Sequence, residues 1–73
     1  MRIDFVPTTN TNEYVCAVFA DTFLLGMCFN SSGTPVLHRF DSLHIPRIYN
    51  SEEATRQILQ AYRVYCVTVR LSA

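Results

Sequence analysis

The stretch HIPRIYNSEEATRQILQAY, residues 44–62, decides the fold because it marks where an extended chain gives way to a helix. Asn50 is a favourable N-cap residue, and Glu53 follows three residues later, in the spacing of a capping box. Apolar residues then recur at helical spacing, namely Ala54, Ile58, Ala61 and Tyr65. We therefore expect a helix that begins within two residues of Asn50 and packs through one apolar face.

The spacing of apolar residues changes after this helix. From Tyr65 onward, apolar and polar residues alternate through YCVTVRL, residues 65–71, and three of these residues are β-branched. Strict alternation is typical of a half-buried strand. We therefore expect the chain to close with a strand after the helix.

Four extended segments precede the helix, and polar breaks separate them. The segments are rich in β-branched and aromatic residues, or alternate apolar with polar residues, and cover residues 2–6, 13–20, 23–29 and 36–40. Turns are expected at Asp21-Thr22 and in NSSGTP, where Gly33 can adopt a positive φ. TTNTN (8–12) is expected to form a loop.

The segment DSLHIPRIY, residues 41–49, is expected to be irregular or to lie at a sheet edge, because Pro46 lacks a backbone donor. The expected order is thus β-β-β-β-α-β. This order predicts an α+β fold in which residues 1–73 form one small domain. Its antiparallel sheet has four or five strands, with the one helix packed on one face.

The central hairpin determines which residues face the helix. A two-residue turn at Asp21-Thr22 places Ala20 opposite Phe23. One face then holds Val15, Ala17, Phe19, Leu24, Gly26 and Cys28. The other holds Tyr14, Cys16, Val18, Leu25, Met27 and Phe29. The first face has small residues at its centre and suits the helix. The second is then covered either by residues 41–49 or by another chain, because a monomer rarely exposes so large an apolar surface. A three-residue turn would instead place Cys16 opposite Cys28.

Composition excludes several classes of function. Six basic and six acidic residues give a formal net charge of zero, so no general field attracts nucleic acid. The longest apolar run, residues 15–20, is too short to span a bilayer, and the first ten residues lack the pattern of a signal peptide. We therefore expect a cytoplasmic protein in which the three cysteines are buried free thiols.

No residue pattern indicates catalysis or a cofactor. The cysteines and histidines lack the short spacing of a zinc site. Ser42 could be combined with Asp41 and with His38 or His44, but no nucleophile-elbow pattern accompanies them. Glu52 and Glu53 are accounted for by the helix start. We therefore predict that the protein is not an enzyme and needs neither metal nor cofactor.

The favoured interpretation is a small protein-binding module, an accessory or inhibitor protein of the kind that phages and mobile elements encode. It would dock on a partner protein or on a second copy of itself, as a homodimer. The expected contact residues are Tyr14, Val18, Leu25, Met27, Phe29, Arg39 and Arg70. The first alternative is binding of single-stranded nucleic acid on the sheet, with Tyr14 and Phe29 stacking on bases and Arg39 and Arg70 near the phosphate backbone. No RNA-recognition motif is present, however. A small enzyme subunit is the second alternative.

Overall fold

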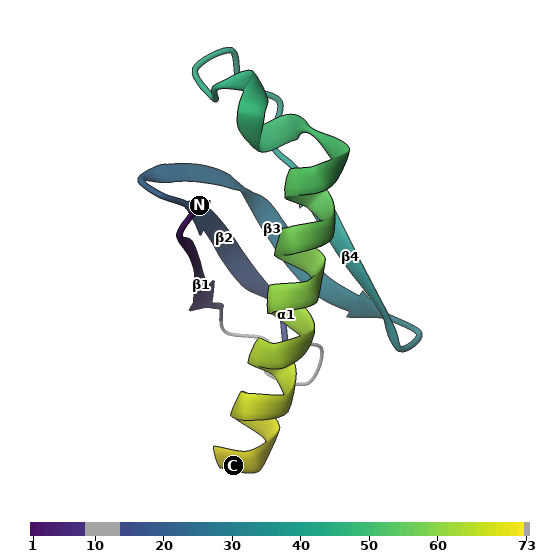
Figure 1. Ribbon diagram of the computed structural model, residues 1–73. Coiled ribbons are helices and arrows are strands. Elements are labelled where there is room, and N and C mark those ends of the chain that lie inside the picture. Colours follow the sequence, from purple (N-terminus) through teal and green to yellow (C-terminus); the bar gives the residue numbers. More distant parts are fainter. Residues whose placement is uncertain (9–13, 73) are drawn as a thin grey trace.

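The computed structural model describes residues 1–8 and 14–72, and of Leu71 and Ser72 it describes the backbone only. It contains a four-stranded antiparallel sheet in the order β1-β2-β3-β4, followed by one long helix that crosses one face of the sheet (Figure 1). The elements are β1 (Ile3–Pro7), β2 (Cys16–Ala20), β3 (Phe23–Ser31), β4 (Thr34–Arg39), the 3₁₀ helix η1 (Arg47–Asn50) and α1 (Glu52–Ser72). The predicted α+β fold, with one helix on an antiparallel sheet, is confirmed. Most of the loop predicted at residues 8–12 lies outside the described residues.

The predicted last strand is wrong, because α1 continues to Ser72. Ile58, Tyr62 and Cys66 are buried at successive four-residue intervals and pack into the core. The predicted face included Ala61 and Tyr65, whereas the most buried positions after Ile58 are Tyr62 and Cys66. The alternation after Tyr65 indicated a strand, but packing against the sheet outweighs the modest strand preference of the valines there.

The helix begins within two residues of Asn50, as predicted, but Asn50 is not its cap. The backbone amide of Ala54 donates to the hydroxyl of Ser51 at 3.0 Å, so Ser51 caps the first turn. The side-chain oxygen of Asn50 instead accepts a hydrogen bond from Arg39 at 3.1 Å. The sequence therefore predicted the helix start correctly but placed the cap one residue too early.

Both predicted turns are present. Ala20 pairs with Phe23 across the two-residue turn, where Asp21 has a φ of 54°. Ser32 and Gly33, with φ values of 52° and 81°, join β3 to β4. Positive φ at both central residues is typical of a tight hairpin turn, and it suits the twist of the strands.

A β-bulge at Leu25 changes the predicted faces of the central hairpin. Phe19 pairs with Leu24, yet the next pair is Val18 with Gly26, so Leu25 has no partner on β2. The extra residue brings Cys16 opposite Cys28, although the turn itself has two residues. The prediction that the helix covers the face of Ala17, Phe19 and Leu24 is also wrong. The helix covers the other face, where Val18 and Leu25 are 0% and 1% exposed. The bulge separates Met27 and Phe29 from Leu25, so these two residues lie on the side away from the helix.

The core lies between the sheet and α1. Its buried side chains are Cys16, Val18, Ala20, Leu25, Cys28, Ile58, Tyr62 and Cys66. Gly26 has a steric role in this layer, because a Cβ there would collide with the carbonyl oxygen of His38 and lie 2.9 Å from the Cα of Arg39. The bulge therefore requires glycine where β3 and β4 approach each other.

Residues 41–49 are irregular up to η1, in line with the sequence. Ile45 and Tyr49 pack against the core, and the Tyr49 ring lies 5.4 Å from that of Phe23. Leu43 is fully exposed. Since Ala20, the partner of Phe23, is buried on the helix side, Ile45 and Tyr49 extend the helix side of the core. The segment therefore adds to the cover that α1 provides on the side of Val18 and Leu25.

Leu24 and Leu25 provide a test of the bulge. Leu25→Glu places an unpaired charge in the core and should unfold the protein, because that cost of several kcal/mol rivals a total stability of about 5–15 kcal/mol. Leu24, its neighbour, is 41% exposed, so Leu24→Glu should leave the fold intact. Circular dichroism and urea unfolding compare the two variants. Equal destabilisation of both would contradict the assigned register.

Candidate protein-binding surface

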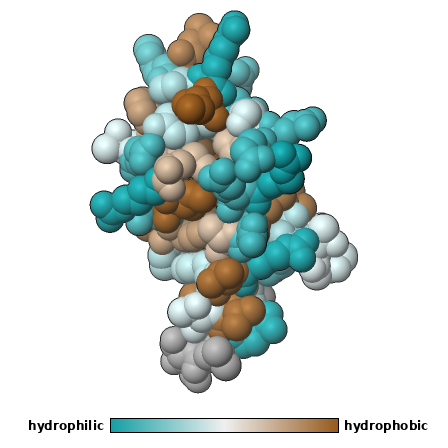
Figure 2. All heavy atoms as spheres, in the orientation of Figure 1, coloured by the Kyte–Doolittle hydropathy of each residue, from teal (hydrophilic) through white to brown (hydrophobic). Residues whose placement is uncertain are grey.

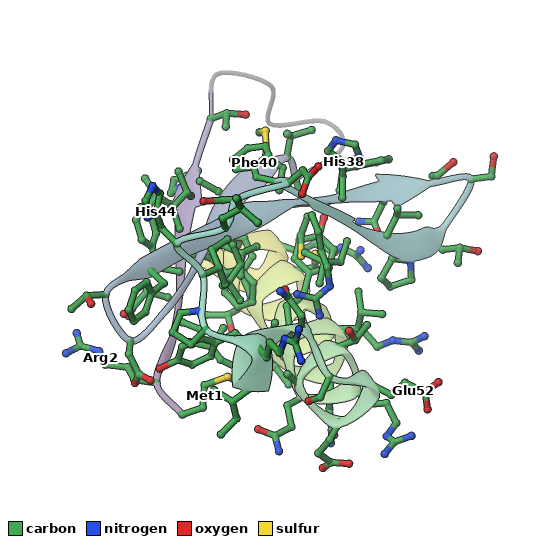
Figure 3. All side chains as sticks on the ribbon, turned by 90° about the horizontal axis from the view of Figure 1, so that it is seen from above. Met1, Arg2, His38, Phe40, His44 and Glu52 are labelled. Carbon is green, nitrogen blue, oxygen red and sulfur yellow. The ribbon has the colours of Figure 1, made fainter. Side chains whose placement is uncertain are left out.

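The side of the sheet away from α1 carries a continuous group of apolar side chains, which we call the open face. Strand alternation and the register place on it Asp4, Val6, Ala17, Phe19, Leu24, Met27, Phe29, Val36, His38 and Phe40. Figure 3 shows His38 and Phe40 on this side, opposite the helix. Val6 is 49% exposed and Phe40 is 39% exposed. The open face is thus apolar surface that no described element covers.

Few charges interrupt the open face. Asp4 forms an ion pair with Arg2, with 3.1 Å between Oδ2 and Nε. The rings of His38 and Phe40 lie 6.4 Å apart in an edge-to-face arrangement. An antiparallel sheet usually presents a polar face to solvent, so this composition suits contact with another apolar surface.

The seven predicted contact residues do not form one surface. Met27 and Phe29 lie on the open face and are partly buried. Val18 and Leu25 belong to the core. Tyr14, Arg39 and Arg70 lie on the helix side, as the next paragraphs describe. Phe19, Leu24 and Phe40 lie on the open face but are absent from the predicted set. Alternation groups Phe19 with Leu24 correctly, and the error was to assign their face to the helix.

Tyr14 and Arg70 join the start of β2 to the end of the helix. The hydroxyl of Tyr62 donates to the carbonyl oxygen of Tyr14 at 2.9 Å. The guanidinium carbon of Arg70 lies 5.8 Å from the centre of the Tyr14 ring, within the range of a cation–π contact. Tyr14 therefore helps to anchor α1.

Arg39 connects β4 to both helices. Its Nη1 donates to the carbonyl oxygen of Tyr49 at 2.8 Å, and its Nη2 donates to the hydroxyl of Thr55. These acceptors are uncharged, and partial burial lowers the pKa of the Arg39 guanidinium from its ordinary value. Five donors in a planar fork suit this three-way connection between β4, η1 and α1.

The three cysteines are buried free thiols. Burial raises the pKa of Cys16 to about 11 and that of Cys28 to about 12. The thiolate is the reactive form, so these groups are poorly suited to nucleophilic chemistry at neutral pH. Within residues 1–8 and 14–72, no group of three histidine, cysteine or acidic side chains is arranged to hold a metal ion.

Two of the candidate hydrolytic residues, Ser42 and His44, form a local turn. The backbone amide of His44 donates to the hydroxyl of Ser42 at 3.3 Å. A nucleophile and its base would instead be joined through the histidine ring. The observed geometry is that of a Ser-initiated turn.

Comparisons of the chain with protein-family models, with curated proteins and with solved structures found no match. Within the described part of the chain, neither helix is both long enough and apolar enough to cross a membrane. Functional inference therefore rests on the surfaces of the protein itself.

Replacing Arg39 should loosen the connection between the sheet and the helix start. Arg39→Met removes the donors to Tyr49, Asn50 and Thr55. We expect it to cost about 2 kcal/mol, a usual value for hydrogen bonds to a charged group. Arg39→Lys should recover only part of this loss, since lysine lacks the fork. Arg47→Met, at an exposed arginine of η1, is the control for urea unfolding, and an equal loss there would contradict the assignment.

Stability should fall in alkaline solution because of the buried thiols. In the unfolded chain a cysteine titrates near its ordinary pKa of 9.0, whereas folded Cys16 and Cys28 retain their protons to about 11 and 12. The unfolded state then binds fewer protons, so stability is complete below about pH 9 and decreases as the pH rises through the folded pKa values. Burial also raises the pKa of Tyr62, which acts in the same direction.

Urea unfolding between about pH 7 and 11 measures this dependence. Cys28→Ala should lower stability at neutral pH, because it removes a buried group, yet flatten the alkaline decrease. An unchanged slope in this variant would show that Cys28 does not contribute to it.

Proposed function

We propose that the protein is a protein-binding module that docks through its open face. The observation that carries this proposal is the coherent apolar face formed by all four strands on the side away from α1. The helix packs against the opposite face of the sheet. A partner surface would complete the second layer that a two-faced apolar sheet requires.

The composition of the open face favours protein over nucleic acid as the partner. Its phenylalanines could stack on bases, but binding of nucleic acid also requires cations along the phosphate backbone. Arg39 and Arg70, which the nucleic-acid alternative relied on, make their contacts on the helix side. Arg2 is paired with Asp4. We therefore favour an apolar protein surface as the occupant.

A docking role agrees with the small size of the chain and with the roles of its polar groups. Arg39 and Tyr62 bind elements of the chain to one another, and Ser51 caps the helix. Such a scaffold presents a rigid face, which reduces the entropy cost of association. The proposed activity is that of an accessory or inhibitor protein that acts by occupying a surface of its partner, or of a second copy.

A site-specific photo-crosslinker tests the proposal. Benzoylphenylalanine at position 27 should form a crosslink in cells that naturally express the protein, because Met27 lies at the centre of the open face. The same group at position 48 is the control, since Ile48 is 73% exposed on η1, away from the sheet face. A product of twice the chain mass identifies self-association, and another mass identifies a partner protein.

A second substitution shows whether the crosslink depends on the face. Phe29→Glu in the same chain should reduce the yield by about tenfold or more, because it places a charge in an apolar interface. Ile48→Glu should leave the yield unchanged. Crosslinks that are absent at position 27, or equal at positions 27 and 48, would contradict docking through the open face. Circular dichroism verifies that each variant is folded.

A further inference from the structure

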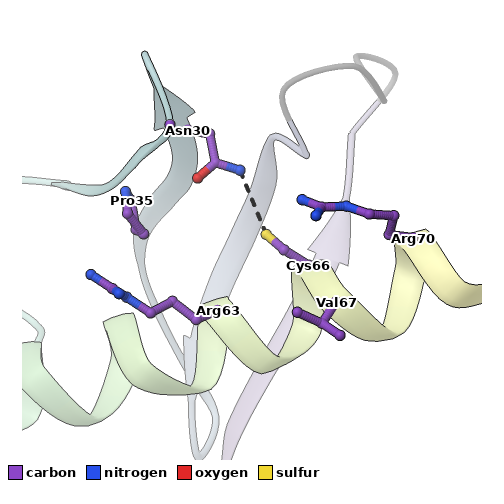
Figure 4. Close-up of a pocket in the computed structure, with 7 residues that line it drawn as sticks. Asn30, Pro35, Arg63, Cys66, Val67 and Arg70 are labelled. Carbon is purple, nitrogen blue, oxygen red and sulfur yellow. Dashed lines mark hydrogen bonds between the residues drawn. The ribbon is translucent and has the colours of Figure 1, made fainter.

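A pocket of about 290 Å³ lies on the other side of the molecule, between the β3–β4 hairpin and the C-terminal half of α1 (Figure 4). Asn30, Gly33 and Pro35 of the hairpin line it, together with Arg63, Cys66, Val67 and Arg70 of the helix. The helix supplies cations and a valine, while the hairpin supplies an amide and a proline. The pocket thus combines polar donors with apolar walls, as small-ligand sites do.

The two arginines carry positive charge that the described carboxylates do not neutralise. Figure 4 shows Arg63 on the Pro35 side of the pocket and Arg70 on the other side of Cys66. Within the described part of the chain, Asp4 pairs with Arg2 and Glu53 pairs with Arg56, and no carboxylate is within ion-pair distance of Arg63 or Arg70. Among the described side chains, the lining of the pocket thus carries two cations and no anion, which suits an anionic ligand.

Asn30 adds a polar group between these cations. Its Nδ2 lies 3.7 Å from the sulfur of Cys66, which is a weak acceptor. A carboxylate or phosphate oxygen would be a much stronger acceptor for the same N–H group. The Asn30 amide is thus positioned to exchange its thiol contact for one with an anionic ligand.

The remaining wall is apolar and continues beyond the pocket. A neighbouring hollow of about 280 Å³ shares Arg63 and Val67 with it and also contains Val64. Val64 and Val67 are 63% and 52% exposed. Figure 2, which views the molecule from the α1 side, shows hydrophobic and hydrophilic side chains next to each other over the lower part of the helix. A ligand here would meet branched aliphatic groups beside the arginines.

We propose that this pocket binds a carboxylate attached to a short branched aliphatic group. The carboxylate accepts hydrogen bonds from Asn30 and from one of the flanking arginines, and the aliphatic group packs on Val67 and Pro35. Arginine matches the planar shape of a carboxylate, and the aliphatic wall favours an amphipathic ligand over a bare anion. This chemistry is found at the C-terminus of a peptide and in free branched carboxylic acids. The site is separate from the open face and does not depend on its function.

A matched pair of small probes tests the recognition of the carboxylate. N-acetyl-leucine contains both groups, and N-acetyl-leucinamide differs by having a neutral amide in place of the carboxylate. In ¹H–¹⁵N NMR titrations we expect N-acetyl-leucine to shift the Asn30 side-chain and Gly33 backbone signals saturably, with a Kd of about 1 mM. The amide should bind at least about tenfold more weakly. Equal binding of both probes, or no saturable shift from N-acetyl-leucine, would overturn the proposal.

Charge variants identify the cations that bind the probe. Arg63→Gln and Arg70→Gln each remove a flanking charge, and at least one of them should raise the Kd by about tenfold. Arg56→Gln is the matched control, because Arg56 is on the same helix but paired with Glu53 at 2.6 Å. Signal dispersion in the same spectra shows that each variant is folded. An equal effect of all three substitutions would indicate general attraction and reject the site.

Two further probes distinguish a peptide C-terminus from a free carboxylic acid as the ligand. Tighter binding of N-acetyl-leucine than of 4-methylpentanoate supports a peptide C-terminus, while equal binding supports a free carboxylic acid. Inorganic phosphate lacks the aliphatic group and should bind more weakly than either. If phosphate binds as tightly, with the same dependence on the arginines, the aliphatic part of the proposal is wrong.

Discussion

The bulge at Leu25 is the constraint on which the rest of the structure depends. It places one extra residue of β3 opposite β2 and directs Leu25 into the core, while Met27 and Phe29 remain on the open face. The following Gly26 lets the backbone of β4 approach to a distance that no other residue would allow. Packing of α1 and exposure of the open face are therefore two results of the same local irregularity.

The local elements could be predicted from the sequence because their signals are local. The hairpin turns depend on Asp21 and on Ser32-Gly33, and the helix start depends on residues within one turn of Ser51. The bulge could not be predicted in this way, since LLGM is compatible with uninterrupted alternation. The bulge occurs beside Gly26, where β4 approaches closely, and this approach involves residues more than ten positions away. The unrecognised bulge shifts the alternation of β3 by one residue, so Met27 and Phe29 lie on the side opposite Leu25.

The difference between local signals and contacts of distant residues also explains the errors in the predicted contact set. Arg39 and Arg70 were predicted to lie on the same contact surface as the aromatic residues of the sheet. In the structure, the C-terminal end of β4 meets η1 and α1, and Arg39 finds uncharged oxygen acceptors there. The helix extension likewise carries Arg70 to Tyr14. Such contacts depend on where the helix ends and on how it crosses the sheet. Neither property can be predicted from a short stretch of sequence.

The edges of the sheet bear on the way in which a partner would dock. An exposed edge strand can recruit another strand through its free backbone groups. Here β1 ends at Pro7 and β4 has Pro35 near its start, and proline has no N–H group to donate to an added strand. Both edges are also short, with five and six residues. Strand addition would thus gain little, whereas the open face offers apolar side chains from all four strands. The physical features of the chain therefore favour association through the face of the sheet over association through its edges.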